Sequence, residues 1–133
     1  MSNSTMANEL FAQKYRVYAE DTDFMGIVYH ARYLNFFERA RSDALRQHGI
    51  SLTRLASCDY HLAITEVNLD YRHPARLEDE ILITTWMNQV RSCSIVFKQK
   101  MENQDNRLLC EATIKVVCID SAMKPKRLPK QFV

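Results

Sequence analysis

The sequence predicts an α+β fold in which a curved antiparallel sheet wraps around one long central helix. Helical periodicity is confined to one segment of the N-terminal third, and period-2 alternation dominates the rest of the chain. Strands that follow one another through short connections pair antiparallel, so one amphipathic helix against them gives a two-layer arrangement. With 133 residues, the chain is expected to form a single domain over residues 1–133 that buries its own core.

The first elements follow from local patterns. Residues 1–12 are predicted to be a flexible N-terminal arm, and "KYRVYAED" after them is predicted to be a strand. The long helix is predicted over residues 31–49, "ARYLNFFERARSDALRQHG", because its apolar residues recur at helical spacing opposite a polar face. Gly49 after a basic last turn is typical of a helix end. "SLTRLAS" is expected to add a short helical turn.

From residue 60 onward the alternation has the period of a strand. The predicted strands are "HLAITEVNLDYRH", "DEILITTWMNQV", "CSIVFKQKM" and "LLCEATIKVVCID". "NQDNR" is predicted to be a turn, because Asn and Asp favour turns. Pro125 and Pro129 exclude the tail from the centre of a sheet.

Composition excludes several function classes. The net charge is +2 with acids and bases interspersed, which argues against a nucleic-acid partner. The basic tail "KPKRLPK" is expected to be solvated, with contact to phosphate or anionic lipid as the alternative. No signal peptide or apolar run of the ~20 residues that span a membrane is evident, so a cytoplasmic location is predicted. The four cysteines lack C-x-x-C spacing and the histidines lack zinc-ligand spacing, so no metal site is predicted.

The stretch "DTDFMGIVYH", Asp21 to His30, places two carboxylates, a glycine and a histidine just before the long helix. Acids and histidines in such positions most often serve as caps, turn residues or surface groups. The alternative is catalytic, because the first N–H groups of a helix are free to stabilise an oxyanion. A neighbouring carboxylate can activate water or attack a carbonyl, and a glycine permits the tight turn between them.

The longer segment "YRVYAEDTDFMGIVYHARYLNFFERAR" resembles the signature of YbgC-like acyl-CoA thioesterases, within the 4-hydroxybenzoyl-CoA thioesterase group of hotdog-fold proteins. The shared pattern is D-T/C-D, two variable residues, Gly, two apolar residues, an aromatic and often His. "YRHPARLEDEILITT" and "LPK" extend the resemblance to most of residues 14–131. One departure is Ala19 beside Tyr18, where many members carry a second aromatic residue, and this puts a role for a tyrosine there in doubt.

The resemblance implies a hotdog fold, a homodimer or homotetramer, and active sites at the dimer interface. It implies hydrolysis of acyl-CoA or acyl-carrier thioesters without a metal or cofactor, and it leaves acyl carrier protein and peripheral membrane association open as further partners. Asp23 is then the catalytic nucleophile or general base, and Asp21 is structural. His30 is expected to be catalytic through its side chain, while its N–H or a neighbouring one polarises the carbonyl.

The substrate-binding residues expected from the motif are Gly26 and Tyr29. Gly26 lets the thioester approach the backbone. Tyr29 is assigned to substrate binding, with packing in the core as the alternative. Arg91 and Ser92 lie between two predicted strands, where the family often places basic residues near the nucleotide of CoA.

Two alternatives remain open. Glu38, deeper in the long helix, is a second candidate base, although an ion pair on the helix with a neighbour such as Arg41 is the more ordinary reading. The whole protein is predicted to be an acyl-CoA thioesterase. The competing function is a non-catalytic acyl-binding or scaffold protein of the same fold, linked to lipid metabolism or the cell envelope.

Overall fold

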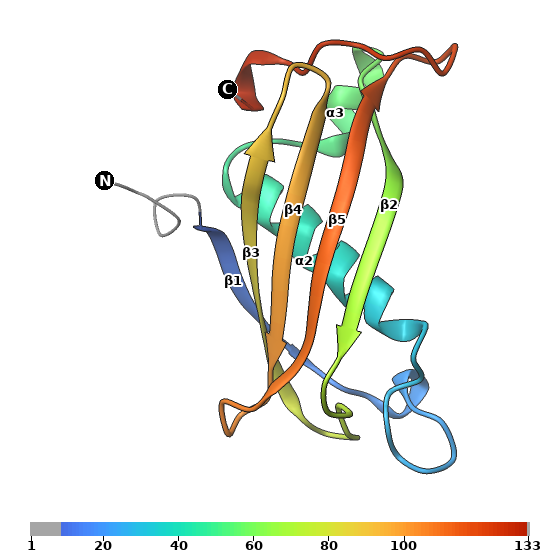
Figure 1. Cartoon of the computed structure of the whole chain (residues 1–133), viewed down its shortest axis with the longest axis vertical. Helices are drawn as coiled ribbons and strands as arrows, with labels where there is room; N and C mark the ends of the chain where they lie inside the picture. The colour runs from blue at the N-terminus through green and yellow to red at the C-terminus, as the bar shows by residue number, and fades with distance from the viewer. Residues whose placement is uncertain (1–8, 133) are drawn as a thin grey trace.

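A computed structural model describes residues 9–132 and shows one sheet with one long helix across a face (Figure 1). The strands are β1 (Glu9–Arg16), β2 (His61–Tyr71), β3 (Glu80–Val90), β4 (Ser94–Glu102) and β5 (Leu108–Ile119). The helices are α2 (Arg32–Gln47) and the short α3 (Leu52–Ser57), with 3₁₀ turns at Ala19–Asp21 and Lys130–Phe132. All neighbouring strands are antiparallel in the order β1-β3-β4-β5-β2, so the predicted α+β architecture is confirmed.

The predicted N-terminal arm is wrong for residues 9–12. They belong to β1, which pairs antiparallel with β3 and carries a bulge between Glu9 and Phe11. The part of the arm before them, residues 1–8, lies outside the described residues. The first strand was also expected to continue to Asp21, but it ends at Arg16 and the chain turns through the 3₁₀ segment Ala19–Asp21. Pairing with β3 therefore decided the strand limits, which local propensity misplaced.

The predicted long helix and the four later strands are confirmed. Gly49 adopts a φ of 79° just beyond α2, which is the left-handed conformation that ends many helices. Aromatic and small residues of α2 face the sheet, and the buried members are Tyr33, Phe36, Phe37, Ala40 and Ala44. A buried amide also links the layers: Gln99 Nε2 on β4 donates to Phe37 O at 2.9 Å and to Thr85 Oγ1 on β3 at 3.0 Å. These bonds fix α2 against the middle of the sheet.

The helix covers the sheet unevenly. α2 packs against β1 and β3, whereas β2 forms the opposite edge. On β2 the side chains that point to the helix side remain open to solvent, with Ile64 49%, Val67 45% and Tyr71 50% exposed. An apolar strip beside an unpaired strand edge is a surface that proteins usually cover.

Candidate functional site

The predicted motif forms a closed loop ahead of α2. An antiparallel bridge joins Thr22 to Val28, and Asp23 N donates to Ile27 O at 2.9 Å. Gly26 sits at the tip with a φ of 77°, a conformation that glycine adopts without strain. The predicted turn role of Gly26 is therefore confirmed.

The two carboxylates of this loop, Asp21 and Asp23, have different surroundings. Asp21 is only 3% exposed, and its side chain accepts hydrogen bonds from Tyr18 N at 2.9 Å and Arg32 Nε at 3.1 Å. Asp23 is half-buried, and its Oδ1 accepts from Met25 N at 2.8 Å within the loop. For Oδ2 of Asp23 the structure gives no hydrogen bond to any residue among 9–132. Asp21 therefore stabilises the loop through its two hydrogen bonds, while Oδ2 of Asp23 is available to contact water or a substrate.

His30 lies two residues before the start of α2, next to the N-cap residue Ala31, and is exposed. Its ring packs at 4.4 Å, centroid to centroid, against Tyr29, and its carbonyl accepts from Tyr71 Oη at 2.8 Å. Within residues 9–132 the backbone N–H of His30 has no hydrogen-bond acceptor. Tyr29 is exposed too, which excludes the alternative that it packs in the core.

A cavity of about 280 Å³ opens in front of this helix end. Its lining residues come from the loop, α2, β2 and the segment after β2, and they are Val28, His30, Tyr33, Tyr71, Arg72, His73 and Pro74. The Tyr33 and Tyr71 rings meet edge to face at 5.1 Å, and Tyr33 Oη accepts from Ala75 N at 3.0 Å. Neither Tyr71 nor Tyr33 had been given an individual role from the sequence. The only available signal was the family-like segment "YRHP", which gave no individual role.

Arg91 and Ser92 lie at the other end of the sheet, in the turn between β3 and β4 (Figure 1). The neighbouring Cys93 O accepts from Cys118 N, and Cys118 is paired with Leu62 near the start of β2. Tyr71, beside His30, is at the other end of β2, roughly 30 Å away at ~3.3 Å per residue. A single chain therefore brings Asp23, Gly26, Tyr29 and His30 together but not Arg91 and Ser92.

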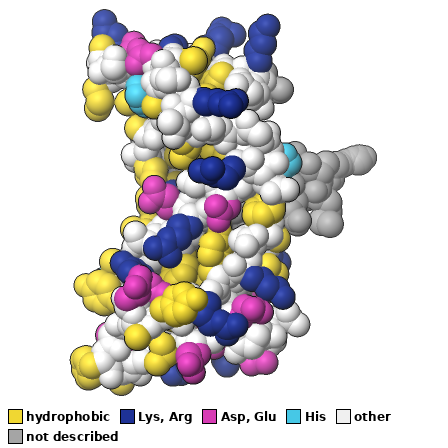
Figure 2. Space-filling view, turned by 180° about the vertical axis from the view of Figure 1, so that it is seen from behind, with side chains coloured by type: hydrophobic (Ala, Val, Ile, Leu, Met, Phe, Trp, Pro, Cys, Tyr) yellow, Lys and Arg dark blue, Asp and Glu magenta, His cyan; other side chains and the backbone are white. Residues whose placement is uncertain are grey.

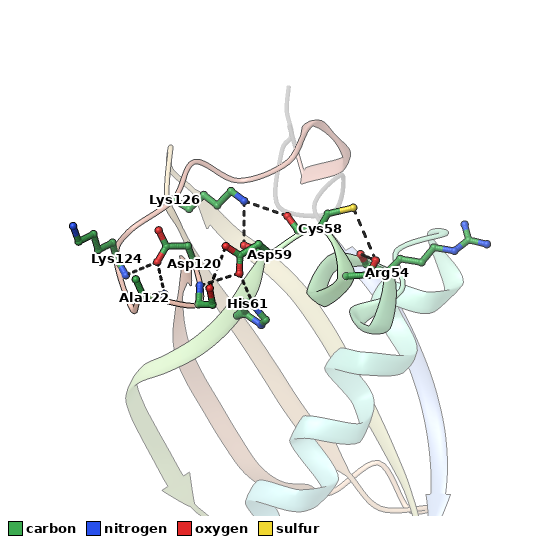
Figure 3. A network of polar contacts seen from close by, with 10 residues as sticks. Arg54, Cys58, Asp59, His61, Asp120, Ala122, Lys124 and Lys126 are labelled. Carbon is green, nitrogen blue, oxygen red and sulfur yellow. Dashed lines mark hydrogen bonds and ion pairs between the residues drawn. The ribbon is translucent and has the colours of Figure 1, made fainter.

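A polar network occupies the end near Arg91 (Figure 3). Lys126 Nζ donates to Cys58 O at 3.2 Å and Asp59 O at 3.1 Å, and it lies 3.9 Å above the Tyr60 ring. Burial raises the pKa of Asp59, but hydrogen bonds from His61 and Ser121 outweigh this and lower it overall. The expectation of a solvated tail is thus wrong for Lys126. Because Ser121 bonds the carboxylate and not the imidazole, the network is an anchor for the tail and not a nucleophile with its base.

In the part of the chain that the structure describes, no three His, Cys, Asp or Glu side chains converge as metal ligands. None of the described helices combines the length and the apolar character needed to cross a bilayer.

Comparison with known proteins adds independent evidence. The family model of the thioesterase-like superfamily matches residues 17–133. The chain belongs to this superfamily. It is 43% identical over 129 residues to an Escherichia coli O6:H1 protein named acyl-CoA thioester hydrolase YbgC, covering 96% of both chains. It is 38% identical to a Haemophilus influenzae protein named acyl-CoA thioesterase YbgC, covering 95% of this chain and 93% of that one.

Among solved structures, a probable thioesterase from Bartonella henselae superimposes with a TM-score of 0.85 at 33% identity. The match covers 90% of this chain and 98% of that chain. The hotdog thioesterase fold and the YbgC-like resemblance predicted from the sequence are therefore confirmed.

Proposed function

We propose that the protein hydrolyses acyl-CoA thioesters at the loop of residues 21–30. The observation that carries this proposal is the His30 N–H, which has no hydrogen-bond acceptor among residues 9–132. His30 lines a cavity just ahead of a long helix, and the half-buried Asp23 belongs to the same loop. The names of the relatives in Escherichia coli and Haemophilus influenzae support the acyl-CoA class of substrate.

In this mechanism the thioester carbonyl oxygen accepts a hydrogen bond from the His30 N–H. The positive end of the α2 dipole favours the negative charge that develops on that oxygen. Asp23 either removes a proton from the attacking water or attacks the carbonyl carbon and is released by water in a second step. The C–S bond breaks, the thiolate takes a proton, and the products are a free acid and a thiol. In this proposal the imidazole of His30, which packs against the Tyr29 ring, supplies the proton to the departing sulfur.

The functional unit that we infer is at least a homodimer, paired through the open edge of β2. Antiparallel pairing of two β2 strands turns the second copy end for end. Arg91 and Ser92 of the partner subunit then come to the end of the sheet that carries His30, where they can contact the nucleotide of CoA. A homotetramer, an acyl carrier protein as an alternative carrier and a cytoplasmic location stay predictions.

A complementation experiment tests this composite site. Asp23→Asn and Arg91→Ala homodimers are each assayed at low acyl-CoA concentration and then mixed under conditions of subunit exchange. In a composite site, half of the sites in each mixed dimer regain both wild-type residues, so activity rises above that of either parent. Mixing without any gain would place Arg91 outside the partner's site.

The activity itself is tested by release of free thiol from acyl-CoA esters with short, long and aromatic acyl groups. Wild-type protein is expected to release thiol far above buffer, and Asp23→Asn is the matched control. Binding of acyl-CoA with no thiol release across this panel would favour the non-catalytic acyl-binding or scaffold function.

A further inference from the structure

Arg41 on α2 is a buried cation for which the described part of the chain supplies no counter-ion. The residue is 7% exposed, and the structure gives its guanidinium one hydrogen bond, from Nη1 to Gln99 Oε1 at 3.0 Å. Within residues 9–132 no carboxylate lies within 4.0 Å of it, so the ion pair expected between Arg41 and Glu38 does not form. Burial lowers the pKa of Arg41 to about 10, while the nearby charge of Glu38 opposes this shift. The side chain remains charged at neutral pH.

A buried charge that is not paired carries a large desolvation penalty. Gln99 cannot remove this penalty, because its amide is neutral and its Nε2 already donates to Phe37 O and Thr85 Oγ1. A guanidinium has five N–H donors, and four of those on Arg41 have no acceptor among the described residues. The environment of Arg41 is therefore incomplete in one chain.

Arg41 borders a cavity beside the surface that α2 leaves uncovered. Arg41 and Glu38 line a cavity of about 260 Å³ between α2, α3 and β2, together with Leu45, Leu62 and Ile64. Next to the cavity, Leu34 on α2 and Val67 on β2 are exposed. Figure 2, seen from the side opposite to Figure 1, shows hydrophobic side chains interspersed with charged ones across the exposed surface. An apolar surface with a buried cation and an unpaired carboxylate fits a partner of the same mixed character.

The positions of Glu38 and Arg41 along α2 favour a second copy of this chain as the partner. At one end of the uncovered strip the rings of Tyr33 and Tyr71 meet at 5.1 Å, and at the other end Leu45 and Leu62 line the same cavity. Counted by residue number, the midpoint between these ends falls near Arg39 on α2 and near Val67 on β2. A two-fold axis through the middle of β2, which pairs the whole strand with its copy, therefore passes level with the turn of α2 between Glu38 and Arg41.

Glu38 and Arg41 are three residues apart and share one face of α2. Across a two-fold axis at this level, two copies of α2 run antiparallel, and each Glu38 comes opposite the other copy's Arg41. We propose that Arg41 pairs with Glu38 of the partner subunit, so that two symmetric ion pairs close the centre of the dimer interface. The inference rests on the homodimer proposed above, and it names the residues that make that dimer specific.

Mixed dimers can separate pairing between chains from pairing within a chain. One mixed dimer combines a Glu38→Gln chain with an Arg41→Met chain, and it keeps one intact pair between subunits. The other combines a wild-type chain with a chain that carries both substitutions, and it keeps no pair between subunits. Both contain the same substitutions, so effects of losing the Gln99 contact cancel.

The measurement is the dissociation constant of each mixed dimer, obtained with two affinity tags and fluorescence-detected subunit exchange. We expect the dimer of two singly substituted chains to have a dissociation constant at least about tenfold lower than that of the other mixed dimer. Close charge pairs across interfaces show coupling energies of this size. Equal dissociation constants, or the reverse order, would overturn the inference. Arg41 would then pair with another anion or with Glu38 of its own chain. If Arg41→Met does not fold, Arg41→Gln replaces it in the same design.

The outcome is separable from that of the proposed reaction. A wild-type protein that is monomeric at micromolar concentration would overturn both the dimer and the ion pairs, while thiol release from acyl-CoA would still be judged by its own assay. Equal constants in a dimeric and active protein would overturn the ion pairs alone.

Discussion

Replacing Asp23 with asparagine is expected to abolish turnover without unfolding the protein, and replacing Asp21 is expected to do the opposite. The two carboxylates lie two residues apart but differ in what they hold. Asp23 accepts one loop hydrogen bond, from Met25 N, and an asparagine carbonyl can accept the same bond. The cost to stability is therefore below about 0.5 kcal/mol, as for most substitutions away from buried networks. Loss of the base or nucleophile should lower kcat by about 10² or more.

Asp21→Asn affects a buried and charged contact. One asparagine oxygen cannot replace both carboxylate oxygens, so its NH₂ group must face either Tyr18 N–H or Arg32 Nε–H, which are both donors. Removal of one partner from such a pair costs about 2–4 kcal/mol. For 133 residues, 1 kcal/mol corresponds to roughly 4 °C, so Tm should fall by about 8–16 °C. Activity below the transition should stay within a few-fold of wild type.

The assay combines thermal unfolding by circular dichroism with thiol release at 25 °C for both variants. The reasoning fails if Asp23→Asn keeps near-wild-type kcat, or if Asp21→Asn melts at the wild-type temperature. An Asp21→Asn protein that is as inactive as Asp23→Asn while still folded would assign the catalytic carboxylate to Asp21.

Further predictions concern the rest of the site and the cysteines. His30→Ala should lower kcat by about 10²–10⁴ if the imidazole protonates the leaving thiolate, whereas a change of only a few-fold would leave a role for its backbone N–H alone. Gly26→Ala should lower the free energy of unfolding by about 1–2 kcal/mol. The φ of Gly26 is 77° and nothing lies within 4 Å of an added Cβ, so the substitution introduces backbone strain and no clash. An unchanged midpoint of chemical denaturation would contradict this. Burial raises the pKa of Cys110 to about 12, so the thiol of the folded protein keeps its proton at pH values where the thiol of the unfolded chain ionises. The free energy of unfolding should therefore fall as pH rises from about 9 to 12. Cys110→Ala should flatten that dependence, and Cys58→Ala, at an exposed position, serves as the control.

The sequence predicted the fold well where burial follows a simple period. β5 alternates as expected, with Cys110, Ala112 and Ile114 among its buried residues. β2 was placed correctly as a strand, but its inner face proved exposed, and a bulge between Ile64 and Glu66 shifts its register. Alternation shows which side chains share a face, and it does not show whether that face is covered by the same chain.

The site was predictable only as far as it is contiguous in sequence. The segment from Asp23 to His30 folds into one loop at a helix start, so its spacing carried the geometry. Tyr71 reaches the same place through β2, and no local pattern shows that its hydroxyl bonds His30 O. The buried state of Arg41 was missed for a related reason, because helical periodicity assigns polar residues to the solvent side.

Two separate features of the described residues motivate the proposed homodimer. Arg91 and His30 lie at opposite ends of the sheet, roughly 30 Å apart at ~3.3 Å per residue, so these two residues of one chain do not meet. Arg41 is buried, and no carboxylate among residues 9–132 lies within 4.0 Å of its guanidinium. The proposed role of Arg91 calls for a partner turned end for end, and the proposed pairing of Arg41 with Glu38 calls for an antiparallel partner helix. One two-fold axis through the middle of β2 would satisfy both, so the two proposals predict the same interface, formed by the surface that β2 and α2 leave open, for stability and for catalysis.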